Sequence, residues 1–251
     1  MSQRSRDWVI AGIAIRMHAG SLIVLLLLTW TAAIYFRDHG PDLSQPGYWM
    51  WAASAVVAFL TSMVCHELGH VLAARLTGIR VSGITLFGFG AVVEFEQPPA
   101  SPAVEALIAA AGPLASGAIA ATAWLVGGLP AVYGSPDLAI LLKLIAWGNT
   151  CLLVFNLLPA LPLDGGCIVH AICWHLAGDP QRATRWTTRC DGIVAASLLA
   201  IGAACISMGQ VLLGSGLCLG GLWLGPGEMI LKSSAEEAYE DAPAHQIVPT
   251  K

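Results

Sequence analysis

The sequence predicts an all-α polytopic membrane protein, with about six transmembrane helices and a small membrane-associated β element. Of its 251 residues, 56% are hydrophobic, and the mean hydropathy is +0.70. Only 11% are Asp, Glu, Lys or Arg, whereas a soluble domain carries about 25% charged residues. The apolar residues are also grouped into runs long enough to cross a bilayer. These three observations together exclude an ordinary soluble domain.

The charge of the chain argues against nucleic acid as a partner. The formal net charge is −4, and the isoelectric point is about 5.9. Nucleic-acid-binding proteins present a basic patch or stripe to the phosphate backbone, and this sequence contains none. We therefore expect the lipid bilayer and other membrane proteins to be the partners.

Six segments are apolar over the roughly 20 residues that a transmembrane helix requires. They are residues 18–36, 48–75, 103–129, 138–176, 192–208 and 211–231. The first segment ends in Tyr35-Phe36-Arg37 rather than in a small-residue cleavage site. We therefore interpret it as a retained helix and not as a signal peptide. The predicted regions are an N-terminal segment with the first helix (1–47), a central region (48–176), a C-terminal helix pair (177–231) and a disordered cytoplasmic tail (232–251).

Lys and Arg are concentrated on one side of this predicted topology. If the N-terminus is cytoplasmic, the inner segments contain Arg4, Arg6, Arg16, Arg75, Arg80, Arg182, Arg185, Arg189, Lys232 and Lys251. The outer loops contain Arg37, and Lys143 lies near the outer start of the fourth segment. Cytoplasmic loops of membrane proteins carry an excess of Lys and Arg. The sequence thus predicts a multi-pass protein of the cell membrane with both termini in the cytoplasm.

Residues 79–98 do not have the pattern of a helix. Gly83, Gly88 and Gly90 interrupt the segment, and residues 93–96 alternate between apolar and acidic side chains with the period of a strand. This pattern predicts a β-hairpin or short sheet at the cytoplasmic membrane surface. The alternative is a simple amphipathic connector between the second and third helices.

The second segment contains the sequence His66-Glu67-Leu68-Gly69-His70. An ionised residue at the centre of a membrane helix costs about 2.5–3.5 kcal/mol on insertion scales, so this cluster requires a functional reason. Residues four apart lie about 40° apart on one helix face, where two imidazoles can share one Zn²⁺. Glu67, about 100° from His66, can act as a base on water near the metal. The alternative is that both histidines cap or bridge neighbouring helices.

A third ligand is expected because a catalytic zinc has three protein ligands. The fourth segment contains Asn156-Leu157-Leu158-Pro159-Ala160-Leu161-Pro162-Leu163-Asp164-Gly165-Gly166. Pro159 and Pro162 remove backbone donors and must break the helix. Asp164 follows this break directly, so it is the candidate third ligand. The alternative role for Asp164 is as an N-cap of the next helix.

Together, these two motifs resemble the site-2 protease family of intramembrane zinc metalloproteases (peptidase family M50). The resemblance covers roughly residues 48–176 and implies a three-helix catalytic core. It implies that His66, His70 and Asp164 bind one Zn²⁺ per chain, that Glu67 is the catalytic glutamate, and that Asn156 steadies the substrate carbonyl or oxyanion. Residues 111–116 match a small-residue motif of the family. Many members with six helices carry paired cytoplasmic CBS repeats, and no CBS domain is recognisable in this sequence.

The implied function is zinc-dependent cleavage of transmembrane segments in substrate proteins, as in regulated intramembrane proteolysis. The implied partner is a membrane-protein substrate such as a single-span regulator. The alternative is a non-proteolytic zinc-binding membrane protein, either a transporter or a pseudo-protease. A transporter should carry ligands in several helices along a path, whereas the polar residues here are concentrated at one depth. The sequence therefore favours the protease.

Overall fold

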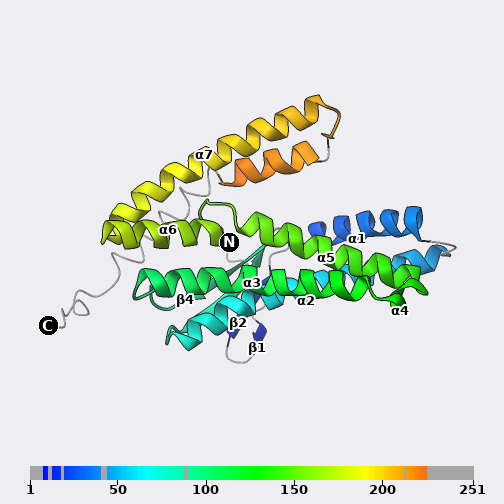
Figure 1. The fold of residues 1–251 in the computed structure, drawn as a ribbon, viewed down its shortest axis with the longest axis horizontal. Helices are drawn as coiled ribbons and strands as arrows, with labels where there is room; N and C mark the ends of the chain where they lie inside the picture. The colour runs from blue at the N-terminus through cyan, green and yellow to red at the C-terminus, as the bar shows by residue number, and fades with distance from the viewer. Residues whose placement is uncertain are drawn as a thin grey trace, which may run out of the picture. The chain divides into compact units, whose positions relative to one another are not determined.

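The computed structural model describes residues 8–10, 13–17, 20–40, 44–87, 90–211 and 213–224. The predicted tail, residues 232–251, lies outside these described residues. The chain folds into two compact units, Met1–Leu157 and Leu158–Lys251. Helices dominate both units (Figure 1), so the predicted all-α class is confirmed.

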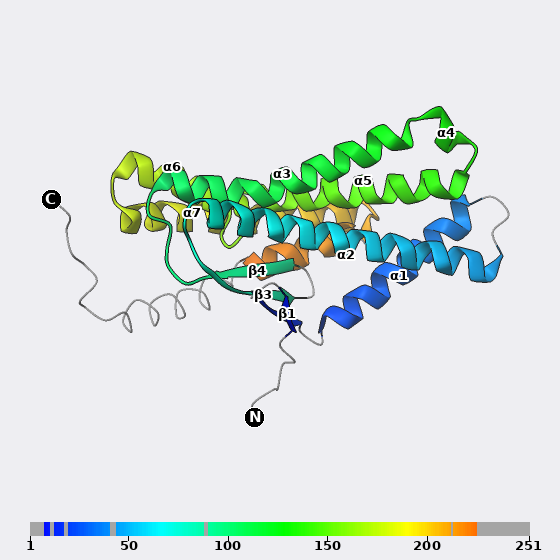
Figure 2. The same cartoon turned by 90° about the horizontal axis from the view of Figure 1, so that it is seen from below.

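The first unit is built on three helices that pack against one another: α2 (Gln45–Leu76), α3 (Pro102–Gly127) and α5 (Pro136–Asn156). Figure 2 shows that α2 and α5 run in the same direction and that α3 runs in the opposite direction. Helix α1 (Gly20–His39) packs against the first half of α2, and the single turn α4 (Pro130–Tyr133) connects α3 to α5.

The sequence determines where α2 begins and ends. Pro46 lies in the first turn, where a missing N–H group has no cost to the helix. At the other end, Gly78 adopts a φ of 81° in the left-handed region, which a residue with a Cβ rarely adopts. The Ile79 N–H then donates to the Ala74 carbonyl at 2.9 Å, and the chain turns into strand β3.

Within the described part of the chain, four helices are long and apolar enough to cross a membrane: Pro46–Leu76 in α2, Pro102–Gly127 in α3, Pro136–Asn156 in α5, and Pro180–Ser207. Large apolar side chains on these helices, such as Leu114 and Trp124 of α3, are exposed and would face lipid. The polytopic prediction is therefore confirmed. The count of six remains a prediction. Helix α1, with 20 residues, is not among these four helices, and the last described helix, over 213–224, is too short to be one of them.

The β element is a four-stranded sheet in the order β1-β2-β3-β4, made of Trp8–Ile10, Ile13–Met17, Val81–Phe87 and Gly90–Phe95. Strands β3 and β4 form the antiparallel hairpin that residues 79–98 predict. Strand β2 pairs with β3 in parallel, and β1 pairs with β2 in antiparallel fashion. Strands β1 and β2 lie before the first predicted helix, and the sequence pattern there did not predict them.

The predicted fourth segment, residues 138–176, is two helices and not one. Helix α5 ends at Asn156, and α6 (Asp164–Ala177) begins eight residues later in the chain. The intervening turn contains Pro159 and Pro162, as the proline positions predict. In the second unit, α6 packs against α7 (Pro180–Ser207), which in turn contacts the helix over residues 213–224 through its Gly202.

Gly69 marks a close approach of α2 to α3, and this approach should limit which residues position 69 accepts. A Cβ there would lie 2.6 Å from the Ala111 carbonyl oxygen and 3.0 Å from its carbon. Backbone atoms cannot rotate away, so Gly69→Ala should lower the free energy of unfolding by about 1–3 kcal/mol. Thermal unfolding in detergent, with the melting temperature as the readout, checks this prediction.

Gly117→Ala on α3 is the matched control. A Cβ at Gly117 would lie 3.6 Å from Leu153 Cδ2, an ordinary van der Waals contact. Its melting temperature should stay close to that of the unmodified protein. Equal losses in both variants would contradict the assignment of Gly69 as a close-contact position.

Candidate metal centre

Helix α2 carries two buried histidines on a helix that otherwise exposes apolar side chains. His66 and His70 are 2% and 6% exposed, whereas Leu68 and Leu72 are 47% and 60% exposed. Positions four apart share a face of the helix, so both imidazoles point away from the lipid-facing side. They point toward α3, which supplies a hydrogen-bond partner to each ring.

The two imidazoles are held by different atoms of α3. His66 Nδ1 lies 2.9 Å from Ser116 Oγ, and His70 Nδ1 lies 2.8 Å from the Ile108 carbonyl oxygen. A carbonyl oxygen only accepts, so His70 Nδ1 carries the proton and a neutral ring leaves the Nε2 lone pair for a metal. Such contacts to the remote nitrogen are how proteins orient histidine ligands.

The Nε2 atoms of the two histidines converge, at a separation of 3.2 Å. Two nitrogens bound tetrahedrally to zinc at 2.0–2.1 Å lie about 3.3 Å apart, so the observed spacing fits a shared zinc ion. Gly112 of α3 leaves room beside them, because a Cβ at this position would clash with both Nε2 atoms. The donor set and the space around it therefore fit the metal that the sequence predicts.

The other predicted residues of the first unit are Glu67 and Asn156. Glu67 follows His66 on α2 and is also buried, at 6% exposure. Asn156 is the last residue of α5 and is partly buried. Its Nδ2 donates to the Leu152 carbonyl at 3.0 Å. A side-chain amide has two N–H groups, so this bond leaves a second donor at the end of the helix.

In the second unit, Asp164 is the first residue of α6. The N-cap position belongs to Leu163, so the alternative role of Asp164 as an N-cap does not hold. Gly166 allows the preceding turn to fold over the start of α6, since a Cβ there would clash with the Ala160 backbone. Asp191 of α7, only 1% exposed, accepts a hydrogen bond from the Leu161 N–H at 2.8 Å. Asp191 therefore holds the turn that leads to Asp164.

Asp191 is not among the residues predicted from the sequence. An acidic residue at the edge of a long apolar run is itself a signal, because a charge within a membrane helix usually has a function or a partner.

The sequence predicts His66, His70 and Asp164 as the three ligands of one metal ion. Three protein ligands are the number that a catalytic zinc takes. Their role as zinc ligands remains a proposal, which is taken up below.

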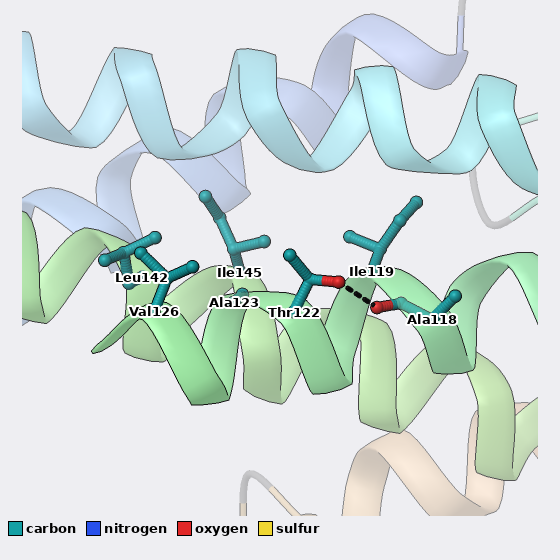
Figure 3. Close-up of a pocket in the computed structure, with 7 residues that line it drawn as sticks. All are labelled: Ala118, Ile119, Thr122, Ala123, Val126, Leu142 and Ile145. Atoms are coloured by element: carbon teal, nitrogen blue, oxygen red, sulfur yellow. Dashed lines mark hydrogen bonds between the residues drawn. The ribbon is translucent and has the colours of Figure 1, made fainter. Parts of the chain in front are cut away.

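A cavity of about 340 Å³ lies between α3 and α5 in the first unit (Figure 3). It is lined by Ala118, Ile119, Thr122, Ala123, Val126, Leu142 and Ile145. The Thr122 hydroxyl donates to the Ala118 carbonyl of its own helix at 2.7 Å, so the lining offers little chemistry. This apolar cavity does not include the histidines, and it is not the candidate site.

The chain matches the profile of peptidase family M50 over residues 54–134 and 133–201. It therefore belongs to this metalloprotease family, and the resemblance drawn from its two motifs is confirmed.

Two similar proteins carry zinc metalloprotease names. Rip3 of Mycobacterium tuberculosis is 34% identical over 219 residues, covering 86% of this chain and 53% of Rip3. The protein sll0528 of Synechocystis is 33% identical over 187 residues, covering 72% of this chain and 47% of the relative. The chain thus spans about half the length of the curated relatives that it matches.

The solved structure of the site-2 protease from Methanocaldococcus jannaschii is also similar. The TM-score is 0.56 with 26% sequence identity, and the match covers 85% of this chain and 91% of that one. The fold is therefore that of a site-2 protease.

The contact between Ser116 and His66 generates a test of the metal centre. Ser116→Ala removes the hydroxyl oxygen that lies 2.9 Å from His66 Nδ1. Loss of such a partner typically lowers metal affinity about 10–100-fold. Competition titration of zinc against a chelator should show this loss. Thr122→Ala on the same helix, which removes a hydrogen bond within α3, is the matched control. Equal affinities in both variants would contradict the assignment.

Proposed function

We propose that this protein is a zinc-dependent intramembrane endopeptidase that cleaves transmembrane segments of other proteins. The observation that carries the proposal is the pair of buried imidazoles beside buried Glu67, on a helix long and apolar enough to span the membrane. A catalytic group inside such a helix meets peptide bonds that are also embedded in the bilayer. The membership of family M50 supports the same reaction class.

In this proposal, His66, His70 and Asp164 hold one zinc ion per chain. The 3.2 Å separation of the two Nε2 atoms and the space beside Gly112 support the histidine pair. Asp164 supplies the carboxylate oxygen that completes three protein ligands. Zinc bound there supplies a Lewis acid that makes water more acidic and polarises the scissile carbonyl.

Glu67 acts first as the general base and then as the general acid of the reaction. Its carboxylate takes a proton from the water as the new bond to the carbonyl carbon forms. It then gives that proton to the amide nitrogen as the C–N bond breaks, so that an amine leaves. Burial of Glu67 keeps bulk water away from this exchange.

Asn156 supports the carbonyl oxygen on which negative charge develops. The second N–H of its amide can donate a hydrogen bond there, while the first is held by the Leu152 carbonyl. The loss of one such donor costs about 10²–10³ in rate in other hydrolases. Asn156 therefore acts as an electrostatic stabiliser and does not exchange protons.

A substrate helix must unwind before any of its carbonyls can react, because each is already hydrogen-bonded within the helix. Strand β4 is the last strand in the order of the described sheet, so its outer edge has no partner strand among the described residues. An extended segment can add to such an edge through main-chain hydrogen bonds. We propose that β4 holds the unwound segment of a membrane-protein substrate such as a single-span regulator.

We also propose that both termini of this protein lie in the cytoplasm.

The second candidate function is zinc binding without proteolysis, as in a transporter or a pseudo-protease. This function would require the ligands but would not require Glu67 as a base. The two functions are therefore separated by the behaviour of Glu67 variants.

Glu67→Gln should abolish proteolysis while zinc content stays near one ion per chain. The reason is that a base acts on water, whereas a ligand holds the ion. His66→Ala and Asp164→Ala should lower both zinc content and cleavage. Metal analysis of the purified variants, together with cleavage of a membrane substrate, checks this prediction. Equal zinc loss in all three variants would make Glu67 a ligand and the proposed mechanism wrong.

Proline in β4 tests the role of the sheet edge. Val92 and Val93 are consecutive, so one directs its N–H toward β3 and the other toward the open edge. Of Val92→Pro and Val93→Pro, the variant that removes the edge donor should lose cleavage with normal zinc content. The loss should be smaller for substrates with Gly or Pro near the cut, since these unwind more easily. Equal loss on both kinds of substrate would mean that the segment is only a connector.

A further inference from the structure

Asn149 of α5 makes a hydrogen bond across the helix bundle in the middle of two apolar helices. Its side chain is fully buried, and its Nδ2 donates to Ser62 Oγ of α2 at 3.0 Å. The same nitrogen donates to the Ile145 carbonyl at 3.0 Å, and the Ser62 hydroxyl donates to the Phe59 carbonyl at 2.8 Å. This polar pair therefore links α2 directly to α5.

Two further features show that this link is specific. Gly148, next to Asn149, allows the helices to approach, since a Cβ there would lie 3.0 Å from the Phe59 ring. The Asn149 Oδ1 is buried without a hydrogen-bond partner among the described residues. A buried, unpaired carbonyl oxygen is costly. The amide therefore contributes little to net stability and needs another explanation.

The position of the link fixes the depth of Asn156 relative to the histidines. Helices α2 and α5 run in the same direction (Figure 2), so equal numbers of residues advance equal distances along both. Asn156 lies seven residues after Asn149, and Gly69 lies seven residues after Ser62. The hydrogen bond thus places Asn156 at the level of Gly69, between His66 and His70.

The link also fixes the direction in which Asn156 points. Seven residues correspond to about 700° of helix rotation, so Asn156 lies within about 20° of the face that carries Asn149. Asn149 faces α2, as its bond to Ser62 shows. The face of α5 that carries Asn156 is therefore also turned toward α2.

We infer that Asn149 is a positioning residue, which acts through Ser62 to hold Asn156 at the depth and orientation needed to meet the substrate carbonyl. This inference rests on the proposed function, because it assigns the positioning of Asn156 to the cleavage reaction. It predicts that Asn149 affects the rate of the chemical step and has little effect on zinc binding, since both imidazoles are held by α3.

The first experiment measures cleavage of a single-span membrane substrate by Asn149→Ala. We expect kcat to fall about ten- to a hundredfold, because small misplacements of a reacting group have effects of this size. KM and zinc content should be unchanged, and the melting temperature should shift by no more than about 2–4 °C. Thr150→Ala is the matched control, since its hydroxyl bonds only to the Ala146 carbonyl of its own helix in the described contacts. It should retain the rate of the unmodified protein.

A double-mutant cycle separates positioning from a structural role. In an Asn156→Ala background, Asn149→Ala should lower kcat by no more than about twofold, because the group that it positions is already absent. The exchange variant Ser62→Asn/Asn149→Ser restores a hydrogen-bonding pair of similar total volume and should recover part of the rate. Independent, multiplicative losses in the cycle would overturn the inference, as would full activity of Asn149→Ala.

A second measurement does not depend on activity. Nitroxide labels at the exposed positions Val64 and Val154, in a variant without the seven native cysteines, report the distance between α2 and α5. Asn149→Ala should shift or broaden this distance distribution, whereas Thr150→Ala should leave it unchanged. An unchanged distribution in Asn149→Ala would overturn the inference. An unmodified protein that cleaves no membrane substrate would instead overturn the proposed function, and the distance alone would then decide whether Asn149 sets the register.

Discussion

The convergence of two imidazoles inside an apolar helix is the constraint on which the rest of the structure depends. Buried polar groups are costly without partners, so His66 and His70 each require a hydrogen bond from another element. Helix α3 supplies both, through Ser116 and the Ile108 carbonyl. To provide both hydrogen bonds, α3 must lie very close to α2. Gly69 and Gly112 allow this close approach. Within residues 111–116, Gly112 and Ser116 are thus explained by their contacts with the two histidines.

The chain between Asn156 and Asp164 is a turn and not a continuous helix. Backbone groups released at membrane depth must be buried by protein or must line a wet cavity. The turn over residues 157–163 meets this requirement in part through the buried carboxylate of Asp191, which accepts from the Leu161 N–H. Gly166 lets the turn fold onto the first turn of α6. The turn over residues 157–163 is therefore stabilised by specific contacts of its own.

Features set by local patterns could be predicted from the sequence. The spacing of His66 and His70 places them on one helix face, Pro159 and Pro162 end a helix, and the glycines of residues 79–98 permit a hairpin. Features set by contacts between distant segments could not be predicted. The pairing of β2 with β3 joins residues 13–17 to residues 81–87, and no local period specifies such a partner. The roles of Ser116, Asn149 and Asp191 likewise depend on which helix faces pack together. A polar residue within an apolar helix signals only that it has a partner or a function, without identifying which.

The most direct test of intramembrane proteolysis is to locate the bond that is cut. The purified protein would be reconstituted with zinc in vesicles containing single-span membrane segments, and the products identified by mass spectrometry. We expect new termini within the apolar part of a transmembrane segment, and we expect them to disappear when a chelator removes zinc. Cuts confined to the soluble flanks, or cuts that persist after zinc is removed, would contradict the account.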